Sequence, residues 1–229
     1  MKKNYPYYPI YLDIEERPVL IIGGGNVCAR KAETMMKYGA RVTIVSPEFT
    51  DEIEQWAREG VLEIHRKSYE ESDLGGASIV IASTDDKCVN GRIARDCRRR
   101  HIPVNVVDVT HLCEFIVPAI VESGSIQIAV STGGKSPALA RTLKEDIQRF
   151  VGPEYDEVNR LLGTLRTAAK KKLPTDIDRK KFFDGIIAGG ILEMLRGGKK
   201  REAYETITRA CDTAGVPVSD ALREALATA

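Results

Sequence analysis

Short apolar runs alternate with longer amphipathic segments in the first half of the chain. The runs, rich in Val and Ile, fall at 19–22, 42–45, 61–64, 78–82 and 104–107. Runs of this length are typical of strands that a sheet buries on both faces. Helices are predicted between them, over 27–38, 51–59 and 86–100. This rhythm predicts an α/β fold with a Rossmann-type parallel sheet and right-handed crossovers.

The pattern changes after residue 108. Two apolar runs, 115–121 and 126–130, lie close together around a glycine, which predicts a hairpin or a pair of strands. Ser136 and Pro137 then form a helix-start signal, and this helix is expected to end at Phe150 or Val151. Further helices are predicted up to residue 229, with breaks near 173–174, 197–198 and 215–217.

Composition excludes several classes of protein. Hydrophobic residues make up 43% of the 229 residues and charged residues 29%, which is the balance of a folded protein and not of a disordered one. The net charge of +1 gives no reason to expect a nucleic acid or an anionic membrane as partner. The cations crowded at 92–101 are interpreted as a solvated helix face. No apolar run approaches the roughly 20 residues that span a bilayer.

Cysteine usage and the N-terminus bear on the compartment. The five cysteines are an odd number without a C-x-x-C pair, so neither a disulfide framework nor a zinc ribbon is predicted. Isolated thiols suit a reducing environment. Residues 1–6 lack the apolar stretch of a signal peptide. We therefore expect a cytoplasmic protein without a structural metal.

The strongest single motif is Gly23-Gly24-Gly25-Asn26-Val27-Cys28. It has the G-x-G-x-x-G form of a dinucleotide-binding turn except at its last position, and it lies between a predicted strand and a predicted helix. The first glycine of the pattern permits the tight turn, and the second lets the backbone approach a pyrophosphate at the helix N-terminus. Cys28 in place of a smaller residue predicts slightly looser packing of the helix on the sheet. The alternative is an ordinary glycine-rich turn.

The second cofactor determinant is expected at the end of the second strand, where an acid usually holds the ribose hydroxyls. This chain has Ser46-Pro47-Glu48 there. Either Glu48, slightly beyond the strand tip, or Ser46 is expected to bind the ribose. No arginine follows the strand to pair with a 2′-phosphate, which favours NAD, although the missing acid leaves NADP open.

Polar residues also follow the fourth and fifth strands, at the sheet edge where ligands bind. Ser83 and Thr84 are expected to line the nicotinamide-ribose pocket, and Asp85 or Asp86 to cap the next helix. Asp108 ends the fifth strand, so its carboxylate faces the same crevice and can act as a base or orient a substrate nitrogen. A capping or turn aspartate is an equally good interpretation of Asp108 by itself.

The segment 131–137 contains a Gly-Lys-Ser sequence but is not a phosphate loop. Ala129 stands where the first glycine of G-x-x-x-x-G-K-S is required, so a nucleoside triphosphatase is rejected. The segment still precedes a helix and carries Lys135, which makes it a candidate site for substrate carboxylates. A plain turn that caps the helix is the alternative.

Together these motifs resemble the precorrin-2 dehydrogenase family, of the siroheme-synthase type. The resemblance covers roughly residues 5–165 and is carried by 8–12, 19–27, 30–32, 82–86, 105–108, 115–119 and 131–137. It implies an oxidoreductase of siroheme (porphyrin) biosynthesis that uses NAD to oxidise precorrin-2 to sirohydrochlorin. It also implies a homodimer with 115–147 at the interface. The implied domains are a dinucleotide-binding domain (1–112), a small α+β dimerisation region (113–150) and a helical C-terminal domain (151–229).

The resemblance also assigns residues. Asp108 matches the family's catalytic aspartate, and the dinucleotide contacts fall on Asn26, Val27, Pro47 and Glu48. Because the tetrapyrrole is rich in carboxylates, we expect its contacts among Thr132, Lys135, Ser136, Arg141 and Lys144. Thr132 stands where the family has a phosphorylatable serine.

Two alternatives stay open. Some family members also insert ferrous iron as a substrate, a lyase (ferrochelatase) activity for which Asp108 or His111 would be the base. His111 is interpreted more simply as a surface histidine. The other alternative is an NAD-sensing regulatory module without turnover. Asp108 and the 131–137 segment argue against that module, since it needs neither.

Overall fold

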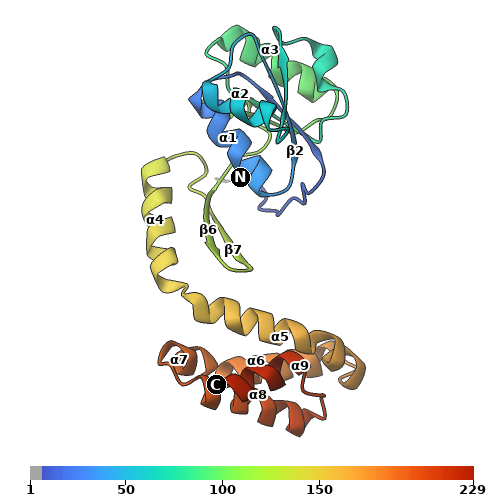
Figure 1. The fold of residues 1–229 in the computed structure, drawn as a ribbon, viewed down its shortest axis with the longest axis vertical. Helices are drawn as coiled ribbons and strands as arrows, with labels where there is room; N and C mark the ends of the chain where they lie inside the picture. Colours follow the sequence, from blue (N-terminus) through green and yellow to red (C-terminus); the bar gives the residue numbers. More distant parts are fainter. Residues whose placement is uncertain (1–6) are drawn as a thin grey trace, which may run out of the picture. The chain divides into compact units, whose positions relative to one another are not determined.

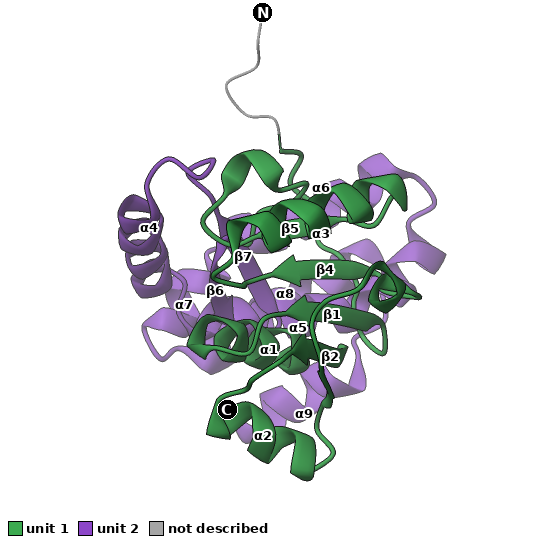
Figure 2. Ribbon diagram, turned by 90° about the horizontal axis from the view of Figure 1, so that it is seen from above, with its two compact units in different colours: residues 1–117 green, residues 118–229 purple. Residues whose placement is uncertain are grey.

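The computed structural model describes residues 7–229. Residues 1–6, on which the expectation of a missing signal peptide rests, lie outside the described residues. The chain forms two compact units, Met1–Val117 (unit 1) and Pro118–Ala229 (unit 2), coloured separately in Figure 2. Within the described residues, none of the helices has the length and apolar character needed to cross a membrane.

Unit 1 is built on a parallel sheet of five strands. These are β1 (Pro18–Ile22), β2 (Arg41–Ser46), β3 (Glu63–Arg66), β4 (Ile79–Ala82) and β5 (Val104–Val106). Their order in the sheet is β3-β2-β1-β4-β5, so the direction of chain progress reverses between β1 and β4. Figure 1 labels β2 in this unit. Ligands of such sheets bind at this reversal, outside the carboxyl ends of the strands. The predicted Rossmann-type sheet is confirmed.

Helices cover both faces of this sheet. They are α1 (Asn26–Lys37), α2 (Asp51–Arg58) and α3 (Lys87–Arg99), with short 3-10 turns η1 (Glu71–Leu74) and η2 (Thr110–Leu112). Alternate side chains of each strand point to opposite faces. Val19 and Ile21 therefore pack with α1 and α2, while Leu20 and Ile22 pack with α3. Figure 2 shows α1 and α2 on one side of the strands and α3 on the other.

The third strand begins later than its apolar run predicted. The run 61–64 predicted a strand there, but β3 covers Glu63–Arg66 and the Val61 side chain is 51% exposed. Gly60 has a φ of +71° and ends α2, and the Val61 N–H donates to the carbonyl of Trp56 at 2.9 Å. Val61 is thus used to close the helix C-terminus, a common ending after a left-handed glycine.

Unit 2 begins with an antiparallel hairpin, as the sequence predicted. It consists of β6 (Ala119–Ser123) and β7 (Ile126–Val130), and α4 (Pro137–Phe150) lies against it. The turn of the hairpin is joined to the helix that follows α4. The Asp156 carboxylate of that helix accepts hydrogen bonds from the N–H and hydroxyl of Ser125, both at 2.7 Å. The hairpin and the helices that follow are therefore parts of one unit.

The rest of unit 2 is helical, in agreement with the prediction. It contains α5 (Pro153–Lys172), α6 (Asp176–Ala188), α7 (Ile191–Arg196), α8 (Lys200–Ala214) and α9 (Asp220–Thr228). Their apolar faces share one core, which includes Leu161, Leu165, Ile191 and Ile207. The sequence analysis did not predict the break between α6 and α7, where Gly190 adopts a φ of +78°.

A nearly buried ion pair joins two of these helices. Glu154, in the first turn of α5, is 8% exposed, and its Oε1 accepts hydrogen bonds from the Arg196 guanidinium of α7 at 2.9 and 2.6 Å. Burial by itself raises the pKa of Glu154, but hydrogen bonds from its own backbone N–H and from Arg196 outweigh it and lower the pKa. The carboxylate therefore favours the folded state when it is ionised.

We expect this carboxylate to make stability depend on pH. Its contribution is present above the ordinary pKa of 4.5 and is lost as the pH falls through the lowered value. Glu154→Gln should reduce the free energy of unfolding at neutral pH and flatten its fall on acidification. Urea unfolding across that pH range measures both effects. Glu193→Gln, at an exposed position of α7, is the matched control, and an equal effect there would contradict the assignment.

Candidate active site

A cavity of about 810 Å³ opens at the carboxyl edge of the unit 1 sheet. The ends of β1, β2 and β4 and the first turn of α1 form its walls. All ten residues that the sequence analysis assigned to the cofactor line this one cavity: Gly23, Gly24, Gly25, Asn26, Val27, Ser46, Pro47, Glu48, Ser83 and Thr84. Segments up to 61 residues apart in the chain are thus brought together, as the Ser83–Ile22 hydrogen bond shows.

The glycine turn is shaped by close contacts between backbones. A Cβ on Gly23, whose φ is +121°, would lie 2.6 Å from the carbonyl oxygen of Ser83. A Cβ on Gly24 would fall on the carbonyl oxygen of Glu48. Gly25 differs, since a Cβ there would meet nothing within 4 Å. The first two glycines are therefore required by the protein itself, and the third leaves open space in which a pyrophosphate can approach the backbone.

The N-terminus of α1 favours binding of an anion. Gly25 is the N-cap and offers no side chain to the N–H groups of the first turn, which also contains no acidic residue. These N–H groups and the helix dipole favour a negative group at this end. Cys28, at the last position of the motif, is fully buried between α1 and the sheet. Burial raises the pKa of its thiol to about 12, so this cysteine stays protonated.

One hydroxyl in the cavity wall has no partner within the described residues. Thr50 precedes α2 and lines the cavity, yet its Oγ1 is buried without a hydrogen bond. A buried hydroxyl is normally paired, so a ligand group in the cavity would supply what is missing. Ser83 and Thr84 differ, because their hydroxyls already donate to the carbonyl of Ile22 and the side chain of Asn90. The open Gly25 and the unpaired Thr50 both fit a bound dinucleotide.

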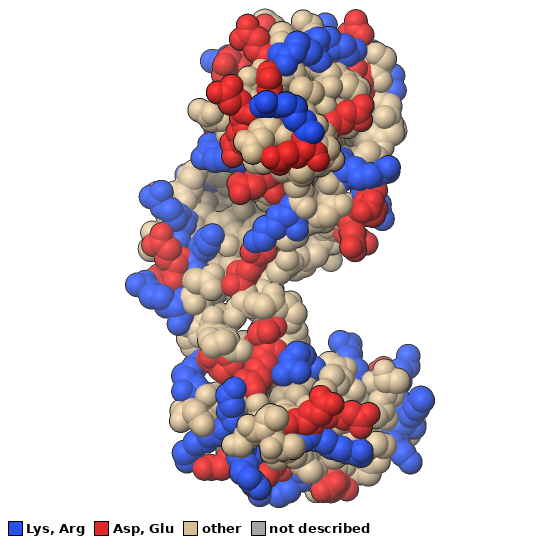
Figure 3. Space-filling view, in the orientation of Figure 1, with Lys and Arg blue, Asp and Glu red and all other residues tan. Residues whose placement is uncertain are grey.

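Acidic side chains dominate the charge around the cavity. Glu48, Asp85 and Asp86 line it, and in the described part of the chain no Lys or Arg does so. Asp86 is the cap of α3, since its carboxylate accepts from the N–H groups of Cys88 and Val89 at 2.7 and 3.2 Å. On the face drawn in Figure 3, acidic and basic side chains are interspersed over each unit. The acidic character is thus local to the cavity wall.

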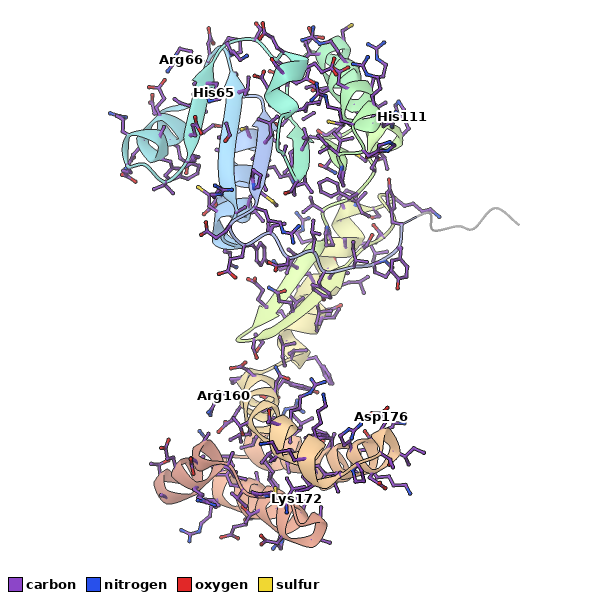
Figure 4. The ribbon with its side chains drawn as sticks, turned by 90° about the vertical axis from the view of Figure 1, so that its right-hand side faces the viewer. His65, Arg66, His111, Arg160, Lys172 and Asp176 are labelled. Carbon is purple, nitrogen blue, oxygen red and sulfur yellow. The ribbon has the colours of Figure 1, made fainter. Side chains whose placement is uncertain are left out.

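The structure also brings an arginine to the strand tip, which the sequence analysis missed. Pairing of β2 with β3 places Arg66 opposite Ser46, and Figure 4 labels Arg66 on β3. Its guanidinium is engaged elsewhere, 2.7 Å from the Glu54 carboxylate and 5.1 Å from the centre of the Phe49 ring. The sequence shows only that an arginine ends the third strand. It does not show that this strand is the neighbour of β2.

Asp108 lies just beyond β5, at the same edge of the sheet as the cavity but not in its lining. The Val107 N–H donates to the carbonyl of Ala82 at 2.9 Å, which continues the pairing of β5 with β4. Asp108 itself is exposed and has a φ of +61°. Left-handed backbone at a residue other than glycine is uncommon, although aspartate tolerates it better than most. The carboxylate is therefore presented outward from a strained turn.

Lys31 is a second charged group near Asp108 that the sequence analysis did not select. It lies on α1 and is partly buried, which is unusual for a lysine. Burial lowers the pKa of Lys31 and the neighbouring Arg30 adds to this effect, while the Asp108 carboxylate opposes it. The ammonium and the carboxylate are thus close enough to interact, although nothing in the local sequence relates the two positions.

The five substrate candidates lie in unit 2, in the loop before α4 and in the first half of that helix. The Thr132 hydroxyl donates to the carbonyl of Ser136 at 3.0 Å, and the Ser136 hydroxyl caps α4 by accepting from the Leu139 N–H at 3.2 Å. The loop is thus closed by its own hydrogen bonds. Lys135 and Arg141 are both exposed. Both hydroxyls thus have partners within the loop or at the start of the helix.

Metal ions in proteins are held mostly by groups of His, Cys, Asp and Glu side chains. Among residues 7–229, no three His, Cys, Asp or Glu side chains are grouped so that they could hold a metal ion. His111, considered as a base for iron insertion, is exposed on η2 (Figure 4).

Three family models match successive parts of the chain. An NAD(P)-binding model matches residues 10–119, a sirohaem biosynthesis protein central model matches 123–149, and a sirohaem synthase dimerisation region matches 154–210. The last of these differs from the sequence analysis, which expected the dimerisation region at 113–150. The apolar pattern there marks a hairpin and a helix, but it cannot say which surface meets a second copy.

Relatives with similar sequences carry the same family name. A siroheme synthase of Thioalkalivibrio sulfidiphilus is 35% identical over 94% of this chain and 44% of its own length. One of Ectopseudomonas mendocina is 38% identical over 86% of this chain and 42% of its own length. The chain therefore spans less than half the length of these relatives.

A solved structure matches over its full length. SirC, a precorrin-2 dehydrogenase, superposes with a TM-score of 0.70 and 26% identity, covering 89% of this chain and all of SirC. The match extends through both units. With three family models on successive parts of the chain, and relatives similar over nearly the whole chain, the chain belongs to the siroheme synthase family and carries that family's NAD(P)-binding, central and dimerisation regions.

Proposed function

We propose that this chain is a precorrin-2 dehydrogenase that oxidises precorrin-2 to sirohydrochlorin with NAD, in siroheme biosynthesis. The observation that carries the proposal is the edge of the unit 1 sheet, where the paired strands β4 and β5 lead to the cavity with the glycine turn and to the exposed Asp108. The similarity to SirC over that protein's full length supports the same activity.

The reaction removes a hydride and a proton from the macrocycle. A bound nicotinamide supplies the hydride acceptor. Asp108 positions the pyrrole nitrogens and takes up the proton, a role for which an exposed, preorganised carboxylate is suited. Lys135 and Arg141 are proposed to bind the carboxylates of the tetrapyrrole, because their charges face solvent and are opposite in sign to the substrate.

Asp108→Ala is expected to lower kcat for NADH formation from precorrin-2 by about a hundredfold or more, because the proton acceptor is lost. Affinity for NAD should stay unchanged, since Asp108 is outside the cavity lining. Stopped-flow absorbance of NADH and calorimetric NAD binding measure the two quantities. Asp108→Asn is the matched variant, because asparagine also tolerates the left-handed backbone but cannot accept the proton.

Normal turnover by Asp108→Ala would contradict the role of Asp108. NAD binding without any turnover by the wild-type protein would support the non-catalytic sensing module instead.

We further propose that the cofactor is NAD and not NADP. The 2′-phosphate of NADP would add negative charge to a cavity lined by Glu48, Asp85 and Asp86. The first turn of α2, beside this cavity, adds Asp51, Glu52 and Glu54. The nearest candidate cation at the strand tip, Arg66, is already paired with Glu54. Like charges without a free counter-charge disfavour the phosphorylated cofactor.

Wild-type protein is expected to prefer NAD over NADP by about tenfold or more in kcat/KM, which corresponds to about 1.4 kcal/mol. Glu54→Gln should narrow this preference, because it frees the Arg66 guanidinium to meet a 2′-phosphate. Glu59→Gln, an exposed acid at the opposite end of α2, is the control. Equal use of both cofactors by wild-type protein would reject the assignment to NAD.

A homodimer is the third part of the proposal. No residue of α4, all of which the structure describes, is buried, and Leu139, Leu143 and Phe150 are 51%, 39% and 64% exposed. A helix with an open apolar face is typical of an interface. We place the contact with a second copy on this face of α4.

Leu139→Glu combined with Leu143→Glu should convert the dimer to a monomer, because two buried charges would have no partners at the interface. Light scattering after size-exclusion chromatography gives the mass. Thr142→Glu, at an exposed position between them, should leave the mass unchanged. A dimer that survives the double substitution would place the interface elsewhere, for example on residues 154–210.

A further inference from the structure

The loop that carries Asp108 must hold an unfavourable backbone conformation. Asp108 lies between β5 and η2 with a φ of +61°. Strained backbone of this kind persists only where the surrounding structure holds it in place. Backbone hydrogen bonds help, since the Val109 N–H donates to the carbonyl of Val106 at 3.2 Å and the Leu112 N–H to that of Val109 at 3.0 Å. These bonds close the turn between the end of β5 and η2.

One side chain contacts the loop on both sides of Asp108. The Sγ of Cys113 lies 3.2 Å from the Val106 nitrogen and 3.1 Å from the Val106 carbonyl oxygen. It also lies 3.5 Å from the carbonyl oxygen of Val109. The sulfur accepts from the Val106 N–H and can donate its hydrogen to either carbonyl. A single thiol thus joins the residues before and after Asp108.

The segment that carries Cys113 is itself held against the sheet. The side-chain amide of Asn105, a buried residue of β5, lies 3.6 Å from the Cys113 sulfur and donates to the carbonyl of Phe115 at 3.0 Å. The Glu114 N–H donates to the carbonyl of Val104 at 2.8 Å. The segment that carries Cys113 therefore runs back along β5, and the thiol is held against the loop by a rigid strand.

The chemistry of this thiol suits a structural donor. Burial raises the pKa of Cys113, an effect that the Val106 hydrogen bond and the Arg98 charge only partly oppose. The group therefore stays protonated at neutral pH and keeps its S–H available. The buried cysteines 28, 97 and 211 each belong to an apolar core cluster, and Cys113 packs against the cluster that contains Cys97. Cys113 is set apart from them by its contacts with polar backbone atoms.

We propose that Cys113 is a positioning residue that clamps the 106–109 loop and so presents the Asp108 carboxylate to the substrate. The inference rests on the proposed function, in which Asp108 acts on precorrin-2. Misplacing a reacting group by about 1 Å can lower a rate by about a hundredfold. The clamp thus adds a requirement for turnover that is separate from binding of the dinucleotide, whose cavity includes neither Cys113 nor the loop.

Cys113→Val tests the clamp, because valine fills a similar volume in extended backbone but can neither donate nor accept. We expect kcat for precorrin-2 oxidation to fall by about tenfold to a hundredfold, with unchanged affinity for NAD. Cys113→Ser keeps a donor and an acceptor and should recover much of the loss. Cys211→Ala, which alters a buried thiol in the helical core of unit 2, should lower Tm but not kcat.

A double-mutant cycle separates positioning from general damage. In an Asp108→Ala background, Cys113→Val should cause no further loss, because the group to be positioned is absent. Single-turnover absorbance measures these slow rates, and circular dichroism verifies the folded fraction of each variant. If Cys113→Val is poorly folded, comparing Cys113→Ser with wild type in both backgrounds makes the same test on a milder change.

The outcomes are distinguishable. An unchanged kcat in Cys113→Val, or the same fold-loss with and without Asp108, would overturn the positioning role while leaving the proposed function standing. Normal turnover by Asp108→Ala alone would instead remove the proposed role of Asp108, on which the clamp depends.

Discussion

The turn after β1 depends on two residues having no side chain. Gly23 and Gly24 each bring the backbone against a carbonyl oxygen from another strand end, that of Ser83 after β4 and that of Glu48 after β2. These contacts lock three strand ends together at the place where the order of the sheet reverses. The cavity exists because the three ends cannot move apart without losing those contacts and the Gly23–Val45 and Thr50–Gly24 hydrogen bonds.

This locked edge carries two opposite electrostatic arrangements. The N-terminus of α1 faces the cavity with free N–H groups and no acid, which suits a pyrophosphate. A short distance away, the N-terminus of α2 begins with acids, and Glu48 lines the wall. The cavity therefore favours negative charge beside α1 and disfavours it beside α2. Such a cavity accepts a dinucleotide more readily when its phosphates lie only at the α1 end.

Catalysis and cofactor binding are assigned to different structural devices in unit 1. The glycine turn is the proposed cofactor site and is defined by backbone shape, while Asp108 stands in a strained loop that the Cys113 thiol contacts. β4 and β5 join the two, because their pairing places the Ser83 segment beside Val107. A substitution in the glycine turn or in the Asp108 loop is therefore expected to leave the other intact. Cofactor binding and turnover can then be measured separately.

The amino-acid sequence by itself determined the elements with local causes. Continuous apolar runs marked the buried strands, and the glycine turn, the helix start at Ser136 and the hairpin around Gly124 follow from residues adjacent in the chain. The ten residues predicted to bind the cofactor line one cavity, because strand ends of a parallel sheet meet at one edge. β3 was misplaced by two residues, because Val61 closes the preceding helix.

Only the tertiary structure decided what lies next to what across strands and helices. Arg66 faces Ser46 through the pairing of β3 with β2, and Glu54 then restrains it. The charges of Lys31 and Asp108 are close enough to interact. The Thr50 hydroxyl has no hydrogen-bond partner in the cavity wall, within the part of the chain that the structure describes. The reason is physical: such contacts depend on strand order and register, which arise from packing the whole core, whereas helix caps and tight turns depend on a few neighbouring residues.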